Sequence, residues 1–181
     1  MIIRTFLIAL VFTTSVAGQS NFDLENISDQ IPQSEEVRNT SSALVQASLY
    51  ELIDQYHALQ QMHWNTRGPH FISIHELTQE FYTELADQID IVAERKLALG
   101  KAADGNPEHV SEQSNLAPYS KDYTKDYKSV SFLIDRYTTM SNRLGERIKN
   151  TPENDLVTQD VFIGLRSTID HHLFLLRSFS Y

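Results

Sequence analysis

Cysteine is absent from the 181-residue chain, and glycine and proline are scarce, with 6 and 5 copies. Without cysteine, no disulfide can stabilise the fold, which must therefore depend on packing or on assembly. A protein built from many strands needs many turns, and turns are rich in glycine and proline. The scarcity of both residues favours long helices over an all-β fold. The length and the 41% hydrophobic content fit one domain with a proper core.

Positive charge is also scarce. The chain has 15 lysines and arginines against 24 aspartates and glutamates, and its formal net charge is −9. Such a surface repels phosphate backbones and attracts cations, so nucleic acid is not expected as a partner. Residues 18–37 carry acidic side chains but no lysine or arginine. We expect residues 18–39 to form an acidic flexible arm ahead of one domain over residues 40–181.

The first 17 residues have the three-part composition of a secretory signal peptide. A cationic start at Arg4 precedes an apolar run over residues 6–12, and the small residues Ser15 and Ala17 flank an expected cleavage region. The segment is too short and wrongly flanked to span a membrane. We expect an exported protein, periplasmic or secreted, with no membrane partner. The alternative is that this segment forms a buried N-terminal helix.

Apolar residues recur at helical spacing in the first half of the domain. Steps of three and four predict a helix over residues 40–66, which Gly68 ends in a left-handed cap. A second helix is expected over residues 73–100, because Ser73 and Glu76 have the form of a capping box. The first half of the domain is therefore expected to be a pair of long helices joined by a short turn.

The second half of the domain repeats this plan after a long connection. Residues 101–120 have little periodicity, and we expect one short helix in them over residues 108–114. A third helix is predicted over residues 121–150, and Thr151 with Pro152 is expected to open a fourth. Four long helices with a long central connection predict an all-α, ferritin-like four-helix bundle. The chain contains no Glu-x-x-His sequence, so an ordinary di-iron site inside the bundle is not supported.

Small and polar side chains share one face of the predicted helix over residues 73–100, and His75, Asp90 and Glu94 lie on it. The two carboxylates are one turn apart and can clamp one cation. His75 precedes Asp90 by fifteen residues, roughly 22 Å at ~1.5 Å per residue. One chain cannot close that gap. A shared metal site would need Asp90 and Glu94 from a second subunit lying antiparallel across a two-fold axis.

Each candidate ligand also has a structural interpretation. Asp90 and Glu94 are followed directly by two basic residues, and such a carboxylate pair is usually part of a solvated face. His63, on the apolar face of the first helix, could be an interior histidine. Trp64, the one tryptophan, is more often a core or interface anchor than a redox partner. The remaining histidines have no evident partners and are treated as structural or exposed: His57, His70, His109, His171 and His172.

Taken together, these residues are more informative than each is alone. The segments that matter are His63-Trp64-Asn65, Arg67-Gly68, Phe71, His75-Glu76, Asp90-Ile91-Val92-Ala93-Glu94-Arg95 and Leu99-Gly100. In this order and spacing they resemble the two sequence signatures of the Dps family of mini-ferritins. The resemblance covers roughly residues 40 to 178. It implies a four-helix bundle with a short helix in its central connection, assembled as a hollow shell of twelve subunits.

The resemblance also implies a chemistry. Members of this family are ferroxidases that oxidise Fe(II), typically with hydrogen peroxide, and store ferric iron inside the shell. By position, His63 and His75 would come from one subunit and Asp90 and Glu94 from its two-fold partner, in agreement with the geometric argument. Mixed imidazole and carboxylate ligands with open positions suit iron. Trp64, beside His63, resembles the family tryptophan near the iron and is the candidate electron donor.

Two features depart from the family pattern. Gln79 stands where the family has an aspartate, and an amide oxygen without charge should bind a second iron of the di-iron centre less tightly. The signal peptide and the acidic arm remove the DNA-compacting role attached to the family name. Asp160, near the start of the fourth helix, resembles an acidic pore residue through which iron enters such shells.

The leading functional hypothesis is an exported, shell-forming ferroxidase and iron store that removes Fe(II) and hydrogen peroxide together and so protects against oxidative stress. The alternative is a secreted, non-enzymatic mini-ferritin-like assembly that sequesters iron or serves in surface interactions. In that alternative, Gln79 impairs the metal centre.

Overall fold

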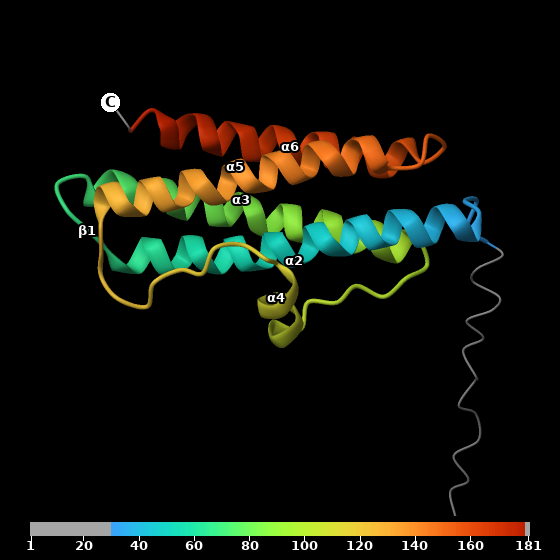
Figure 1. Ribbon diagram of the computed structural model, residues 1–181, viewed down its shortest axis with the longest axis horizontal. Helices are drawn as coiled ribbons and strands as arrows, with labels where there is room; N and C mark the ends of the chain where they lie inside the picture. The colour runs from blue at the N-terminus through green and yellow to red at the C-terminus, as the bar shows by residue number, and fades with distance from the viewer. Residues whose placement is uncertain (1–29, 180–181) are drawn as a thin grey trace, which may run out of the picture.

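The computed structural model describes residues 30–179, which form five α-helices and one pair of two-residue strands (Figure 1). The elements are α2 (Glu35–Asn65), β1 (Thr66–Arg67), α3 (Phe71–Ala98), α4 (Pro107–Gln113), β2 (Thr124–Lys125), α5 (Asp126–Asn150) and α6 (Leu156–Arg177). The predicted signal peptide over residues 1–17, and residues 18–29 of the predicted arm, lie outside the described residues. The prediction of four long helices with a short one in the central connection is confirmed.

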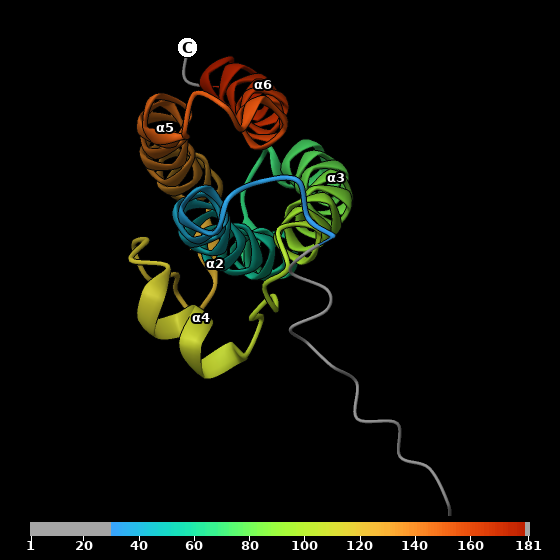
Figure 2. The same ribbon diagram turned by 90° about the vertical axis from the view of Figure 1, so that its right-hand side faces the viewer.

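The four long helices form two layers, α2 beside α3 and α5 beside α6 (Figure 2). The short helix α4 lies against α2, on the side away from α5 and α6. Apolar side chains from all four long helices fill the interior, among them Leu49, Phe81, Tyr137 and Leu165, each at most 2% exposed. Full burial of a large apolar side chain contributes about 1.5–3 kcal/mol. No helix within residues 30–179 is long and apolar enough to cross a membrane.

The first and third long helices begin elsewhere than predicted. Helix α2 starts at Glu35, because the Ser34 hydroxyl accepts the Val37 N–H at 3.4 Å, and the first turn carries acidic residues that favour a helix N-terminus. Residues 35–39, expected in the arm, are therefore helical. Helix α5 starts at Asp126 rather than near residue 121, since the preceding residues 124–125 form strand β2.

The predicted caps of the other two long helices, Ser73 and Thr151, are wrong. Helix α3 starts at Phe71, two residues before Ser73, and Ser73 lies within its first turn. Helix α6 starts at Leu156, where the carboxylate of Asp155 accepts the Thr158 N–H at 3.3 Å. Thr151 instead ends α5, since its hydroxyl donates to the Arg147 carbonyl at 2.8 Å. Both predicted caps therefore lie off the observed helix starts, by two residues at α3 and by five at α6.

The connection between α3 and α5 is held to the bundle at two places, near its end and at its middle. Strand β1 pairs with β2 in parallel, so the turn after α2 is joined to the start of α5. Further along, the buried Glu51 carboxylate of α2 accepts hydrogen bonds from Arg143 at 2.9 Å and from Arg147 at 2.6 Å. Arg143 also donates to the Ser114 carbonyl at the end of α4. The long connection therefore has a defined path across α2.

Candidate metal centre

Two histidines meet at the junction of α2 and α3. The rings of His63 and His75 stack with centroids 3.6 Å apart and planes 16° from parallel. The Nδ1 of His63 lies 2.8 Å from the His75 carbonyl oxygen, and the Nδ1 of His75 lies 2.9 Å from the His63 carbonyl oxygen. A carbonyl only accepts hydrogen bonds, so each Nδ1 carries the proton and donates it. A ring that is protonated at Nδ1 alone keeps the Nε2 lone pair for a ligand.

This arrangement is the one that metal-binding histidines use, since a hydrogen bond from one ring nitrogen orients the ring and fixes the other nitrogen as the donor atom. No described residue hydrogen-bonds either Nε2 atom. Two imidazoles held by each other's backbone carbonyls also lose little side-chain freedom when a metal ion binds. The alternative interpretation of His63 as an ordinary interior histidine agrees with its burial but does not explain the reciprocal hydrogen bonds.

The turn between the two helices sets the spacing of the two rings. Gly68 adopts a positive φ of 148°, and a Cβ at this position would approach the Oδ2 of Asp126 to 2.5 Å. The same Asp126 Oδ2 accepts hydrogen bonds from the backbone N–H of His70 at 3.1 Å and from its Nδ1 at 2.9 Å. The backbone hydrogen bonds from His70 and Tyr127 lower the pKa of Asp126 below its ordinary value. A carboxylate of α5 therefore supports the start of α3, the helix that carries His75.

Asp90 and Glu94 lie further along α3, and both are exposed. Their basic neighbours do not neutralise them. Arg95 donates to Asp155 at 2.7 Å and to the Thr158 hydroxyl, and Lys96 donates to Gln46 on α2. Within residues 30–179, neither carboxylate forms an ion pair. The carboxylate pair is therefore available for a cation or for a second subunit.

The two halves of the candidate centre are not brought together within one chain. His75 and Asp90 are separated by fifteen residues of continuous helix, roughly 22 Å at ~1.5 Å per residue. Among the described residues, no three histidine, aspartate or glutamate side chains lie close enough together to hold a metal ion. A site that uses all four residues needs a second copy of the chain. Gln79, one turn after His75, is exposed on the same helix and adds no charge.

Trp64 is the chain neighbour of His63, but its ring does not pack against the histidine pair in the described part of the chain. Its side chain is 59% exposed, and in the described part of the chain it makes no aromatic contact with either imidazole. Tyr82 of α3 does: its ring stands edge-on to His63 with centroids 5.5 Å apart. Sequence reasoning missed Tyr82, although it lies two helical turns after His75 and therefore on a neighbouring part of the same surface.

Three of the remaining histidines have partners that the sequence did not reveal. His70 pairs with Asp126, and His109 lies 2.7 Å from Asp104. His172 is fully buried between α3, α5 and α6: its Nε2 lies 2.7 Å from Glu84 and its Nδ1 2.9 Å from the Tyr137 hydroxyl. Burial lowers the pKa of His172, although Glu84 opposes this shift. These histidines are structural. Asp160, the candidate pore residue, is exposed on α6.

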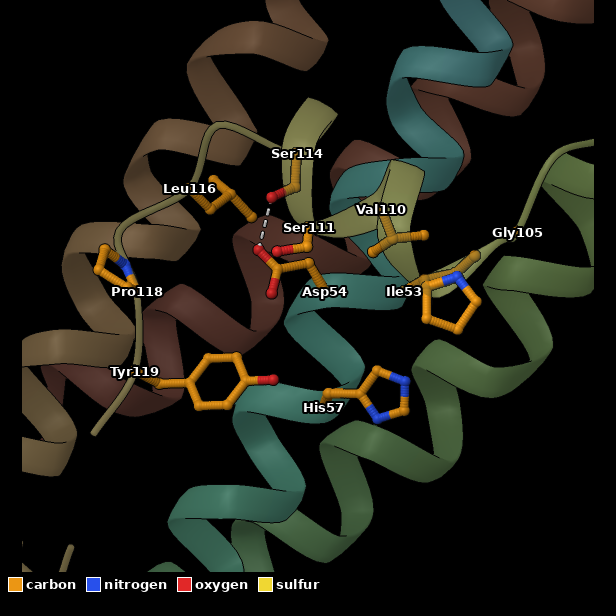
Figure 3. A pocket seen from close by; sticks show the side chains of 11 residues that line it. Ile53, Asp54, His57, Gly105, Val110, Ser111, Ser114, Leu116, Pro118 and Tyr119 are labelled. Atoms are coloured by element: carbon orange, nitrogen blue, oxygen red, sulfur yellow. Dashed lines mark hydrogen bonds between the residues drawn. The ribbon is translucent and has the colours of Figure 1, made fainter. Parts of the chain in front are cut away.

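A separate hollow of about 360 Å³ lies between α2 and the α4 segment (Figure 3). Asp54, His57 and Tyr119 line it, and the Asp54 carboxylate already accepts hydrogen bonds from Ser114 at 2.8 Å and from Arg136 at 3.0 Å. A carboxylate paired with arginine is a poor metal ligand because the guanidinium offsets its charge. This hollow therefore does not compete with the histidine pair as a candidate metal centre.

The bundle, with a short helix in its central connection, defines the ferritin-like class of proteins. Residues 43–179 match the model of the ferritin-like domain family. Solved structures with a similar fold support the same class. Dps92 from Deinococcus radiodurans is 26% identical with a TM-score of 0.78, covering 80% of this chain and 87% of that one. A Dps structure from Mycobacterium smegmatis is 25% identical, also with a TM-score of 0.78, covering 81% of this chain and 89% of that one.

Proteins related in sequence identify the family within this class. A DNA protection during starvation protein from Agrobacterium fabrum is 33% identical over 142 residues, which is 78% of this chain and 88% of the relative. The protein of the same description from Listeria monocytogenes is 32% identical over 124 residues, 67% of this chain and 79% of the relative. The chain belongs to the Dps family of ferritin-like proteins.

Proposed function

We propose that this protein is a ferroxidase and iron store, in which Fe(II) is the substrate and hydrogen peroxide the oxidant. The observation that carries the proposal is the reciprocal hydrogen bonding of the stacked His63 and His75 rings, which engages both Nδ1 atoms and leaves both Nε2 atoms available as ligands. Nitrogen ligands from this pair, with carboxylates from Asp90 and Glu94, form a mixed set that suits iron. Membership of the Dps family supports the same chemistry.

The centre that we propose is shared between two subunits. Because α3 is one continuous helix between His75 and Asp90, the exposed carboxylates of one copy would complete the histidine pair of another across a two-fold axis. Each dimer would then contain two centres. We further propose that dimers assemble into a shell of twelve subunits, with Asp160 at a pore through which Fe(II) enters. The negative net charge of −9 would draw cations towards such a shell.

We propose that the protein is exported and does not bind nucleic acid, so that its protective role would be the removal of Fe(II) and peroxide. The support is the signal-peptide composition of residues 1–17 and the acidic charge balance. The curated relatives are named for DNA protection, and this chain would differ from them in that respect.

A second candidate function rests on Gln79. Without a carboxylate at this position, the second iron would be held weakly, and the assembly would bind and sequester iron without efficient oxidation. The two candidates differ in turnover. The ferroxidase accelerates the oxidation of repeated additions of Fe(II), whereas the sequestering protein binds iron once and then stops.

Stopped-flow absorbance separates these candidates. Apo-protein is mixed with Fe(II) and peroxide, and the formation of ferric product is followed beside a buffer control. We expect clear acceleration by the wild-type protein and none by the double variant Asp90→Ala with Glu94→Ala. Both residues are exposed, so the variant should keep its fold, which circular dichroism checks. No acceleration by the wild type would reject the enzyme, and full activity of the variant would reject the ligand assignment.

A further inference from the structure

A row of aromatic rings leads away from the histidine pair along the junction of α2 and α3. The ring of Tyr82 is edge-on to His63 at 5.5 Å, and Tyr56 is edge-on to Tyr82 at 5.8 Å. The row ends at His57, whose ring is 5.4 Å from that of Tyr56 and lies exposed beside the hollow of Figure 3. Each separation lies within the range of direct aromatic contact. The row therefore connects the candidate metal centre to the protein surface.

The proposed reaction needs an electron donor of this kind, and this step of the argument rests on the proposed function. Peroxide takes two electrons when it is reduced to water, whereas one Fe(II) supplies one. A centre with two firmly held irons supplies both. Here Gln79 weakens the second position, so a site often holds a single iron when peroxide arrives. With no second donor, a one-electron reduction would release a hydroxyl radical.

We propose that Tyr82 supplies the second electron, through the His63 ring, and that Tyr56 shares the resulting radical. The balanced step is Fe(II) + TyrOH + H₂O₂ + H⁺ → Fe(III) + TyrO• + 2 H₂O. Iron and the phenol are each oxidised by one electron, the O–O bond breaks, and both oxygens leave as water. The next Fe(II) restores the phenol: TyrO• + Fe(II) + H⁺ → TyrOH + Fe(III). The cycle consumes two irons for each peroxide.

The surroundings of the two tyrosines suit this role. Both rings pack against the hydrophobic core and are only partly buried, so a phenolic proton can leave to solvent when the ring is oxidised. The Tyr56 oxygen accepts a hydrogen bond from Gln60 at 3.1 Å, which holds the second ring in place. Trp64, the candidate donor from sequence, has no ring contact with either imidazole in the described part of the chain. The direct ring contact with His63 therefore favours Tyr82 over Trp64 as the electron donor.

Freeze-quench electron paramagnetic resonance tests the proposal on the assembled protein. One Fe(II) per histidine pair is mixed with one peroxide, and wild type is compared with Tyr82→Phe. The wild type should give a protein radical whose splitting collapses when tyrosine is ring-deuterated. Tyr82→Phe should lose this signal and release hydroxyl radical to a spin trap in solution. The Tyr82 hydroxyl makes no hydrogen bond within residues 30–179, so the phenylalanine variant keeps its packing.

Tyr123→Phe is the matched control, because Tyr123 is 70% exposed and its ring contacts the Arg67 guanidinium, a contact that phenylalanine keeps. It should behave as wild type. Spin-trap adducts located by mass spectrometry should fall on the peptides that contain Tyr82 and Tyr56. A radical that survives in Tyr82→Phe, or that is insensitive to tyrosine deuteration, overturns the proposal. Absence of accelerated iron oxidation would instead reject the ferroxidase, so the two failures are distinguishable.

Discussion

Replacing Gly68 by alanine should damage both the stability of the protein and its metal centre. The positive φ of 148° is one that L side chains rarely adopt, which costs about 1–3 kcal/mol. The new Cβ would also lie 2.5 Å from the Oδ2 of Asp126, so that carboxylate must move. Its hydrogen bond to the His70 N–H would be lost, and the loss of such a helix cap costs about 0.5–2 kcal/mol.

Together these terms predict a loss of about 1.5–5 kcal/mol in the free energy of unfolding, which corresponds to a fall in Tm of about 3–20 °C for a domain of this length. Differential scanning calorimetry at fixed protein concentration measures it. Gly164→Ala is the matched control, because a Cβ there meets nothing within 4 Å, and replacing a helical glycine by alanine stabilises by about 0.5–1 kcal/mol. In Gly68→Ala the start of α3 shifts, so His75 moves and iron oxidation should slow as well.

A double-mutant cycle separates the cost of the positive φ at residue 68 from the cost of the steric clash between the new Cβ and Asp126. In the background Asp126→Ala the collision partner is gone, so Gly68→Ala should cost only the φ term there. Equal costs in both backgrounds would mean that Asp126 does not constrain the turn. A Tm equal to that of the wild type for Gly68→Ala would refute the reasoning altogether.

Three further predictions follow from single features. Gln79→Asp should raise the number of Fe(II) ions bound per subunit in titration calorimetry, and unchanged stoichiometry would show that Gln79 is not what weakens the second position. His172 has a folded pKa lowered below its ordinary 6.5 by burial. The stabilisation that its neutral form provides is therefore complete above that value and is lost as pH falls towards the lowered pKa. Chemical denaturation at a series of pH values should show this loss, and His172→Gln should flatten the curve; an unaltered slope would exclude His172 as its source. Mass spectrometry of the protein exported by its host should place the mature N-terminus just after Ala17, whereas an uncleaved chain would contradict the export proposal.

The architecture was predictable because apolar periodicity reports directly on which faces are buried. The four long helices followed from the spacing of apolar residues, and the long central connection from the loss of that spacing together with glycine and proline. The residues at which the helices begin were harder to predict. Ser73 has the form of a cap, yet α3 begins at Phe71, since Asp126 from a distant helix satisfies the His70 N–H. A local motif cannot reveal a partner 56 residues away.

The sequence proposes the members of the candidate site, whereas their geometry comes from the structure. Spacing along one helix separated His75 from Asp90 and led to a shared centre, and the structure keeps them on one continuous helix. The reciprocal bonds of His63 and His75 use backbone carbonyls, which every residue has, so no sequence pattern marks them. The contact between Tyr82 and His63 depends on how α2 packs against α3, and only the structure supplies that.

The central claim is that each metal centre takes its histidines from one chain and its carboxylates from another, and mixing two inactive variants tests it. One variant carries His63→Ala and His75→Ala, and the other carries Asp90→Ala and Glu94→Ala. Each pure shell should fail to accelerate Fe(II) oxidation. Shells reassembled from equal amounts should regain about a quarter of the wild-type activity, since half of the random dimers are mixed and each mixed dimer has one complete centre. Mixed shells as inactive as the pure variants would contradict the shared centre.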